Sequence, residues 1–242
     1  VEAGERGGAA EAAAWLGWLL VGRGDAATAG LLGQEALVVA RRLNLSETRT
    51  LALAVLLSVA TARGDTASAW RVLEEHASHP RADRGPFAVA AARWWRSQGQ
   101  PGRALDALAD APTAGFFAVE ATLERGRAHL ARHERNTALE HVEAGRLAAA
   151  AQGFRELDLY ARVLHSQLAP LPAPAWMALV EEAAASGWVE LFLWILALDG
   201  DRRAHFGDSL GARARFVELA ARAAEHGHAP FRSAAAEALG GL

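Results

Sequence analysis

The stretch ARGDTASA, residues 62–69, decides the fold, because it recurs in altered form three more times along the chain. The other copies are GRGDAATA (22–29), SQGQPGRA (97–104) and ARHERNTA (131–138). Each copy follows an apolar stretch of helical character and precedes another such stretch. Recurrence of one turn at a nearly fixed interval is the signature of a repeat architecture.

The same chemistry stands at the same place in each copy. Taking Asp25, Asp65, Gln100 and Glu134 as anchors gives intervals of 40, 35 and 34 residues. Glycine precedes the first three anchors, and His133 precedes the fourth. Glycine at this point can adopt the left-handed conformation that ends a helix, and Asp is well suited to cap the start of the next helix. We therefore predict a helical hairpin around each anchor.

Small side chains recur where the two antiparallel helices of a hairpin would cross. Alanine stands four residues after every anchor, and a small residue stands eight residues before it in three of the four units, with Leu57 as the exception. Small side chains let two helix backbones approach closely, and each hairpin then exposes an apolar face that only the next hairpin can cover. These small residues are Ala29, Ala69, Ala104, Ala138, Gly17, Ala92 and Gly126.

Composition favours helix and excludes several functions. Of the 242 residues, roughly a quarter are alanine, whereas Ile and Tyr occur once each, and alanine has the highest helix propensity. The chain contains no Cys, which excludes disulfides, thiol catalysis and Cys-ligated metals. A net charge of −3 argues against direct binding of nucleic acid. No apolar run approaches the roughly 20 residues of a membrane span, so we expect a cytoplasmic protein that does not enter a membrane.

The period near 34, the Gly-Asp turn and the small-residue positions resemble the tetratricopeptide repeat, in the degenerate form found in the helical signalling domains of MalT-like bacterial regulators. The resemblance implies an all-α fold, a right-handed α-solenoid of antiparallel helical hairpins. Four hairpins would occupy residues 1–150, and more divergent hairpins would continue the solenoid over 151–242. The sequence departs from the pattern in its long first interval and at Gly33 and His76, where bulk and Ala are usual.

Beyond residue 150 the repeat pattern loosens, but helices are still expected. WVELFLWILAL, residues 188–198, is apolar on all faces and is therefore predicted to be buried. The sequence PLPAP (170–174) should break a helix. The other predicted helices are 153–168, 175–186, 209–226 and 229–239.

The stretch RWWR, residues 93–96, contains two adjacent tryptophans, which could either form an exposed binding platform or pack in the interior. When the repeats are aligned on their anchors, Trp95 stands at a position that a large, buried residue occupies in this family, so we predict that Trp95 lies in the core. Trp94 is predicted to pack against a neighbouring hairpin. The resemblance also places six residues on the first helix of each hairpin, on its concave side, where such repeats bind partners. These predicted groove residues are Trp18, Ser58, Thr61, Arg93, Arg96 and Arg127.

The arginines among the groove residues would form a basic strip able to hold a carboxylate or an acidic peptide through bidentate contacts. The alternative is a solvated face whose arginines pair with nearby Glu residues. The resemblance implies a regulatory or sensor module within a larger bacterial signalling or transcriptional regulatory protein, binding a protein segment or a small-molecule effector without cofactor or catalysis. A free-standing scaffold or adaptor without ligand sensing is the second hypothesis. The sequence is compatible with a homodimer.

Two further motifs raise other functions. GDSLG, residues 207–211, matches a hydrolase motif with Ser209 as nucleophile, but that motif must follow a strand and precede a helix. Asp208 or Ser209 as a helix cap accounts for the same residues, which leaves a serine hydrolase as a remote alternative. His129 and His133 are four residues apart, a spacing that suits a metal on one helix face, yet no third ligand is evident, so no metal site is expected.

Overall fold

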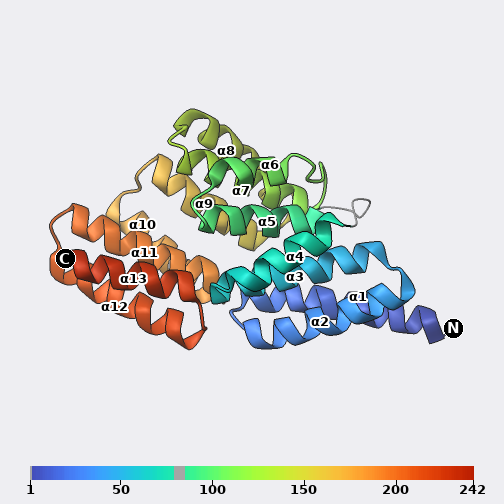
Figure 1. Cartoon of the computed structure of the whole chain (residues 1–242). Coiled ribbons are helices and arrows are strands. Elements are labelled where there is room, and N and C mark those ends of the chain that lie inside the picture. Colours follow the sequence, from blue (N-terminus) through green and yellow to red (C-terminus); the bar gives the residue numbers. More distant parts are fainter. Residues whose placement is uncertain (1, 79–84) are drawn as a thin grey trace.

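The computed structural model describes residues 2–78 and 85–242, and within these ranges the chain folds into thirteen helices and no strand (Figure 1). The all-α prediction is therefore confirmed. The helices are α1 (Glu2–Gly22), α2 (Ala26–Leu43), α3 (Ser46–Arg63), α4 (Thr66–Ala77), α5 (Gly85–Ser97), α6 (Pro101–Leu108), α7 (Phe116–Ala131), α8 (Arg135–Gln152), α9 (Arg155–Leu168), α10 (Ala173–Ser186), α11 (Val189–His205), α12 (Ser209–Glu225) and α13 (Ala229–Gly241).

Each anchor of the recurring turn stands directly before a helix, as predicted. Asp25 precedes α2, Asp65 precedes α4, Gln100 precedes α6 and Glu134 precedes α8. The residue before each anchor has a left-handed backbone, and this holds even for His133, with φ of 62°. The turn is thus one backbone conformation repeated four times, with glycine replaced once by a residue for which this conformation is costlier.

The aspartate anchors cap the helices that follow them. One carboxylate oxygen of Asp25 accepts a hydrogen bond from the backbone N–H of Thr28 at 3.0 Å, and Asp65 accepts one from Ser68 at the same distance. Such a bond satisfies one of the backbone donors that a helix start leaves without an intrahelical partner. The local sequence therefore determines both where a helix ends and where the next one begins.

The small residues of the repeat lie at helix crossings. All four alanines that follow the anchors are fully buried. A Cβ added to Gly126 would lie 2.8 Å from Cγ2 of Val142, and one added to Gly17 would lie 3.1 Å from Cγ1 of Val55. The absence of larger side chains at these positions is therefore a condition of the close packing between α7 and α8 and between α1 and α3.

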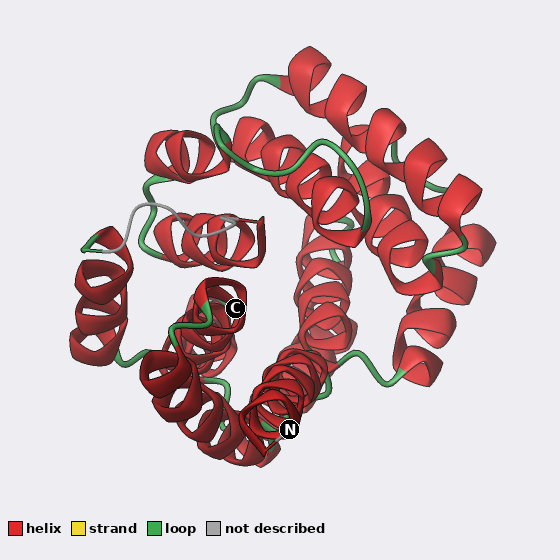
Figure 2. Cartoon of the chain, turned by 90° about the vertical axis from the view of Figure 1, so that its right-hand side faces the viewer, coloured by secondary structure: helices red, strands yellow, loops and turns green. Residues whose placement is uncertain are grey.

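The helices pack in chain order and curve round a common axis (Figure 2). Most helices that follow one another in the chain pack together, and the odd-numbered helices from α1 to α9 also pack in succession, α1 on α3, α3 on α5, α5 on α7 and α7 on α9. The curve brings the last helix, α13, against α3. At this closure a Cβ added to Gly24 would lie 2.8 Å from Nδ1 of His226, so the first turn of the chain approaches the turn between α12 and α13 very closely.

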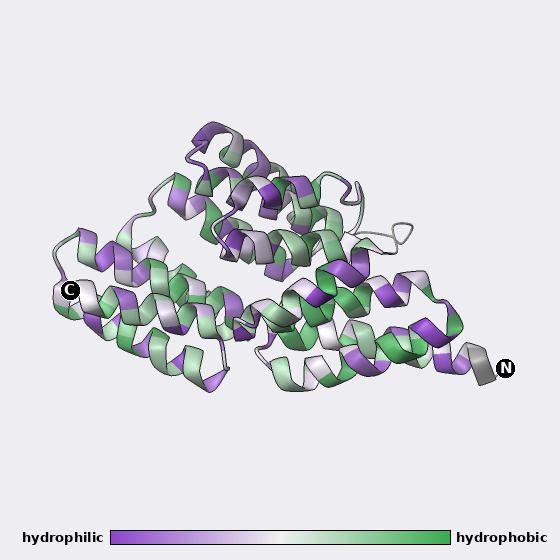
Figure 3. Cartoon of the chain, viewed as in Figure 1, coloured by the Kyte–Doolittle hydropathy of each residue, from purple (hydrophilic) through white to green (hydrophobic). Residues whose placement is uncertain are grey.

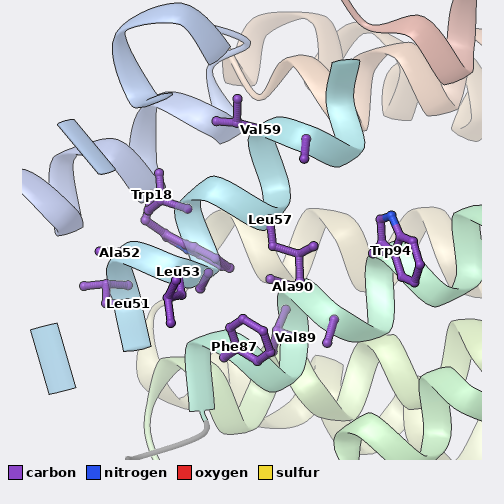
Figure 4. Close-up of a cluster of buried hydrophobic side chains, with 14 of the residues drawn as sticks. Trp18, Leu51, Ala52, Leu53, Leu57, Val59, Phe87, Val89, Ala90 and Trp94 are labelled. Carbon is purple, nitrogen blue, oxygen red and sulfur yellow. The ribbon is translucent and has the colours of Figure 1, made fainter. Parts of the chain in front are cut away.

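The hydrophobic core forms three clusters along the chain. The first joins helices α1 to α7, and Figure 4 shows part of it, where Leu57 of α3 lies beside Val89 and Ala90 of α5. The second and third clusters join α7 to α13. Figure 3 shows apolar and polar residues interspersed along the helices, as expected for helices that each have one buried and one exposed face. Among the described residues, no helix has the length and apolar character needed to cross a membrane.

The second half of the chain follows the predicted helices with one difference. The apolar segment around Trp194 is buried as expected, but its helix, α11, continues to His205, beyond the predicted end at Leu198. The polar continuation is possible because the buried carboxylate of Asp199 is fully bonded. It accepts hydrogen bonds from Nε1 of Trp176 at 2.7 Å and from Nε of both Arg203 (3.0 Å) and Arg215 (2.7 Å).

Of the two adjacent tryptophans, Trp94 packs against a neighbouring hairpin as predicted, but it is also the more deeply buried of the two. Trp94 is the buried one, 2% exposed, whereas Trp95 is only partly buried, so the prediction of Trp95 as a core residue was wrong. Trp70 of α4 packs edge-on against both rings, with centroids 5.2 Å and 5.6 Å away. The guanidinium of Arg103 lies 4.6 Å from the Trp95 ring centroid, at the distance of a cation–π contact.

Candidate functional site

Two adjoining cavities lie on the side of the molecule formed by the odd-numbered helices. The interior cavity has a volume of about 240 Å³ and is lined mainly by α1, α3, α5, α7, α11 and α13. The second cavity, of about 170 Å³, lies between α1, α3, α5, α7 and the start of α11. Val21, Ser58, Arg93 and Glu190 line both cavities. The two therefore form one continuous candidate site between the first and the last helices.

The structure brings all six predicted groove residues to these cavities. Ser58, Thr61 and the three arginines line the interior cavity, and Trp18 lines the second. We call Arg93, Arg96 and Arg127 the arginine triad. Two members come from α5 and one from α7, so the triad depends on the packing of these helices. That the six residues bind a ligand stays a prediction.

Arg93 is the most strongly paired member of the triad. Its Nη2 lies 2.7 Å from Oε1 of Glu120, and its Nε lies 2.9 Å from Oε1 of Glu124. Burial alone would lower the pKa of Arg93, but the two carboxylates raise it well above its usual value. Arg93 therefore pairs with Glu residues, as the alternative interpretation expected. It does not lie on a solvated face, because the Arg93 side chain is only 12% exposed.

Arg127 is held by aromatic residues. Its Nη1 donates to the hydroxyl of Tyr160 at 3.1 Å, and its guanidinium lies 3.9 Å from the ring centroid of Trp194. The Tyr160 hydroxyl in turn donates to Oε1 of Glu124 at 2.8 Å. Burial raises the pKa of Tyr160, so its hydroxyl keeps the proton with which it makes this bond. Tyr160 thus fixes both Arg127 and Glu124.

Arg96 is the least compensated arginine of the triad. Its Nε is 3.5 Å from Oε2 of Glu124 and has no hydrogen-bond partner among the described residues. Burial lowers the pKa of Arg96, and the neighbouring charge of Arg127 lowers it further. The side chain therefore presents to the interior cavity a cation that is opposed by Glu124, which also pairs with Arg93, and by the charge of Glu190.

The two carboxylates on α7 have opposite pKa shifts. Burial would raise the pKa of Glu124, but the whole arginine triad surrounds it and lowers the pKa to about 2. Burial also raises the pKa of Glu120, where Arg93 is the main opposing charge, and the pKa reaches about 7. Near neutral pH, Glu124 is therefore ionised, whereas Glu120 is divided between its charged and neutral forms.

Several polar atoms of the site have no hydrogen-bond partner among the described residues. Besides Nε of Arg96, they include Oγ of Ser58 and Nδ1 of His228 at the interior cavity, and Oε2 of Glu120 at the second cavity. A buried polar atom without a partner costs about 1–3 kcal/mol. A polar molecule bound against these side chains would supply the partners that they lack.

Reasoning from the repeat frame missed the acidic half of this site. Glu124 carries a usable signal, because it stands three residues before Arg127 and so shares its helix face. Glu190 carries no such signal. It stands in the loosely patterned second half and reaches the triad only because the chain curves back on itself. Burial would raise the pKa of Glu190, but Arg93, Arg127 and other cations lower it.

The other sequence motifs lie away from these cavities. Ser209 is the first residue of α12, and Oδ1 of Asp208 accepts a hydrogen bond from the N–H of Gly211 at 2.9 Å, as a helix cap does. A helix, α11, precedes this turn, rather than the strand that a nucleophile elbow requires. Ser209 is exposed, and a hydrolase role for it has no support in this geometry.

His129 and His133 do not lie on one helix, because α7 ends at Ala131. His133 lies in the turn itself, while His129 bonds Glu134 and stacks on His141 with ring centroids 5.2 Å apart. Burial and the neighbouring His129 lower the pKa of His141. In the part of the chain that the structure describes, no group of three or more potential metal ligands comes together.

A comparison of the chain with profiles of known protein families, with curated proteins and with solved structures finds no match in any of the three. The site therefore has to be interpreted from its own geometry.

Proposed function

We propose that this chain is a binding module, a right-handed solenoid of the tetratricopeptide-repeat type, and that its interior cavity takes a small-molecule effector. The repeated turn, the sequential packing of the helices and the small residues at their crossings support the architecture. The observation that carries the function is the meeting of the arginine triad, Ser58 and Glu190 at a cavity closed by the last helix. A cytoplasmic location suits a chain without Cys.

A ligand in this cavity would touch both ends of the curved array. The wall includes Val21 and Gly24 from the first hairpin and Phe231 from α13. Binding would therefore favour the closed arrangement over any more open one, because a ligand shifts a conformational equilibrium by its differential affinity. In a larger regulatory protein, such closure is a means of repositioning attached domains, and this is the sensor role that we propose.

The test is native mass spectrometry after incubation with the small-molecule fraction of a bacterial lysate. The matched variants are Ala234→Trp and Ala236→Trp, both at exposed positions of α13, of which only Ala234 lines the interior cavity. We expect an added mass below about 1 kDa on the wild type and on Ala236→Trp, but not on Ala234→Trp.

Two results would contradict the proposal. An added mass that persists in Ala234→Trp would place the ligand elsewhere. No added mass at all, together with a protein retained from whole lysate, would favour the scaffold or adaptor alternative, in which the outer surface and not the cavity binds.

A further inference from the structure

The charges around the cavities leave room for one more negative charge. The arginine triad faces three carboxylates, those of Glu120, Glu124 and Glu190. When Glu120 is neutral, three cations face two anions, and one positive charge is in excess. This excess is centred on Arg96, whose Nε lacks a hydrogen-bond partner and whose side chain lines the interior cavity.

We propose that the interior cavity binds a monocarboxylate with an apolar body, and that Glu120, which is partly protonated beforehand, takes up a fraction of a proton as the ligand binds. This inference rests on the proposed function and names its ligand class. The ligand's carboxylate would accept hydrogen bonds from the guanidinium of Arg96 and from Oγ of Ser58. Its body would lie along the apolar part of the wall, formed by Val21, Val189 and Phe231.

Charge and shape both favour this class over the neighbouring ones. A phosphate group carries up to two negative charges near pH 7 and would exceed the single excess positive charge. An amine would place a cation beside three arginines, with Glu190 already facing Arg93 and Arg127. A planar carboxylate matches the fork of an arginine, which binds it through two parallel hydrogen bonds. The cavity of about 240 Å³ limits the ligand to a small molecule.

Glu120 is the group that responds to the added charge. Among the described residues, Glu120 forms an ion pair with Arg93 and none with Arg96. A bound carboxylate would add a negative charge to the cluster, raise the proton affinity of Glu120 and draw the proton from solvent, without any bond to the ligand. The other charged or titratable groups around Glu120 and the cavities are Arg23, Arg93, Arg96, Glu124, Arg127, Glu156, Tyr160, Glu190, His226 and His228.

The test uses probes of matched shape. Phenylacetate and octanoate are the carboxylates, phenylacetamide and 2-phenylethylamine are the neutral and cationic controls, and inorganic phosphate is the dianion control. Titration calorimetry at pH 7 in HEPES and in Tris, which differ in ionisation enthalpy, measures the protons taken up. We expect at least one carboxylate to bind with uptake of between zero and one proton, to bind more tightly at pH 6 than at pH 8, and the controls not to bind.

Three variants assign the roles. Arg96→Gln should weaken carboxylate binding by about ten- to a hundredfold, the loss expected for hydrogen bonds to a charged group, whereas Arg42→Gln, the same change at an exposed position, should leave it unaltered. Glu120→Gln should retain binding but abolish the proton uptake. His226→Gln should retain the uptake, which shows that the proton does not go to that histidine. Circular dichroism and melting temperature verify that each variant is folded.

Each failure has its own meaning. Binding of the amine or of phosphate in place of the carboxylates would overturn the ligand class and leave the proposed function intact. Carboxylate binding without proton uptake, or with uptake unchanged in Glu120→Gln, would overturn the coupling. If no probe binds and the lysate fraction also adds no mass, both the inference and the proposed function are wrong.

Discussion

Replacing Glu124 with glutamine should destabilise the protein strongly, although the two side chains have nearly the same shape. The carboxylate is 1% exposed, accepts hydrogen bonds from Arg93 and Tyr160, and lies near Arg96. Glutamine keeps one oxygen as an acceptor but removes the charge and points N–H donors at the arginines. Three buried arginines would then face only Glu190 and a partly ionised Glu120.

The pKa gives the size of the effect. The value for Glu124 falls from the usual 4.5 to about 2 in the folded protein, and each pKa unit corresponds to about 1.36 kcal/mol. The charge therefore contributes about 3 kcal/mol at neutral pH, close to the ~3–5 kcal/mol lost when one partner of a buried ion pair is removed. For a chain of this length, that loss lowers the melting temperature by roughly 6–12 °C.

The stabilisation has a defined pH dependence. Because the folded pKa lies below the unfolded one, the contribution is complete above about pH 4.5 and disappears as the pH falls toward 2. The difference in unfolding free energy between wild type and Glu124→Gln should shrink over that range.

Urea unfolding followed by tryptophan fluorescence measures this difference, since the chain has eight tryptophans. Glu143→Gln is the control, because its pair with Arg146 is more than a third exposed on both sides, and such pairs contribute little. A folded Glu124→Gln whose stability lies within about 0.5 kcal/mol of wild type would refute the account of the buried cluster, since exposed pairs alone reach that size.

Two further substitutions test the repeat geometry. Gly145→Ala should cost about 1–3 kcal/mol of stability by overpacking, because the new Cβ would lie 2.5 Å from Cδ2 of Leu123. Gly240→Ala is the control, because a Cβ there would have nothing within 4 Å. Equal melting temperatures for the two variants would contradict the close α7–α8 packing. His133→Gly should raise the melting temperature by a few degrees, because it removes roughly 1–2 kcal/mol of left-handed strain; a lowered melting temperature in thermal denaturation would show that contacts of the His133 side chain outweigh that strain.

The turns were predictable because they depend on local chemistry. Features that depend on packing between distant helices were not. The Gly-Asp pairs determine helix ends through backbone conformation and capping, which involve only neighbours in sequence. The order of burial of Trp94 and Trp95 depends on Trp70 and Arg103, which belong to other helices. Periodicity alone gives no information on such contacts.

The same division applies to the candidate site. Its basic half was predictable, because the arginine triad follows the repeat frame on two successive first helices. The spacing of Glu124 and Arg127 indicates that the two residues share a helix face, but the burial of Glu120 and Glu124 depends on packing between helices, which the spacing does not reveal. Glu190 joins them from α11 only through the curvature of the whole chain, and this curvature accumulates from small rotations between many hairpins.

The contact of α13 with α3 changes how this array is expected to come apart. An open array frays from its ends, since a terminal unit has a neighbour on one side only. Here the last helix also rests on the early part of the chain, and the first turn lies against His226. Loosening either end therefore disrupts contacts at both, so amide hydrogens in α1 and α13 should exchange together, with protection closer to that of the middle helices than to that of free ends.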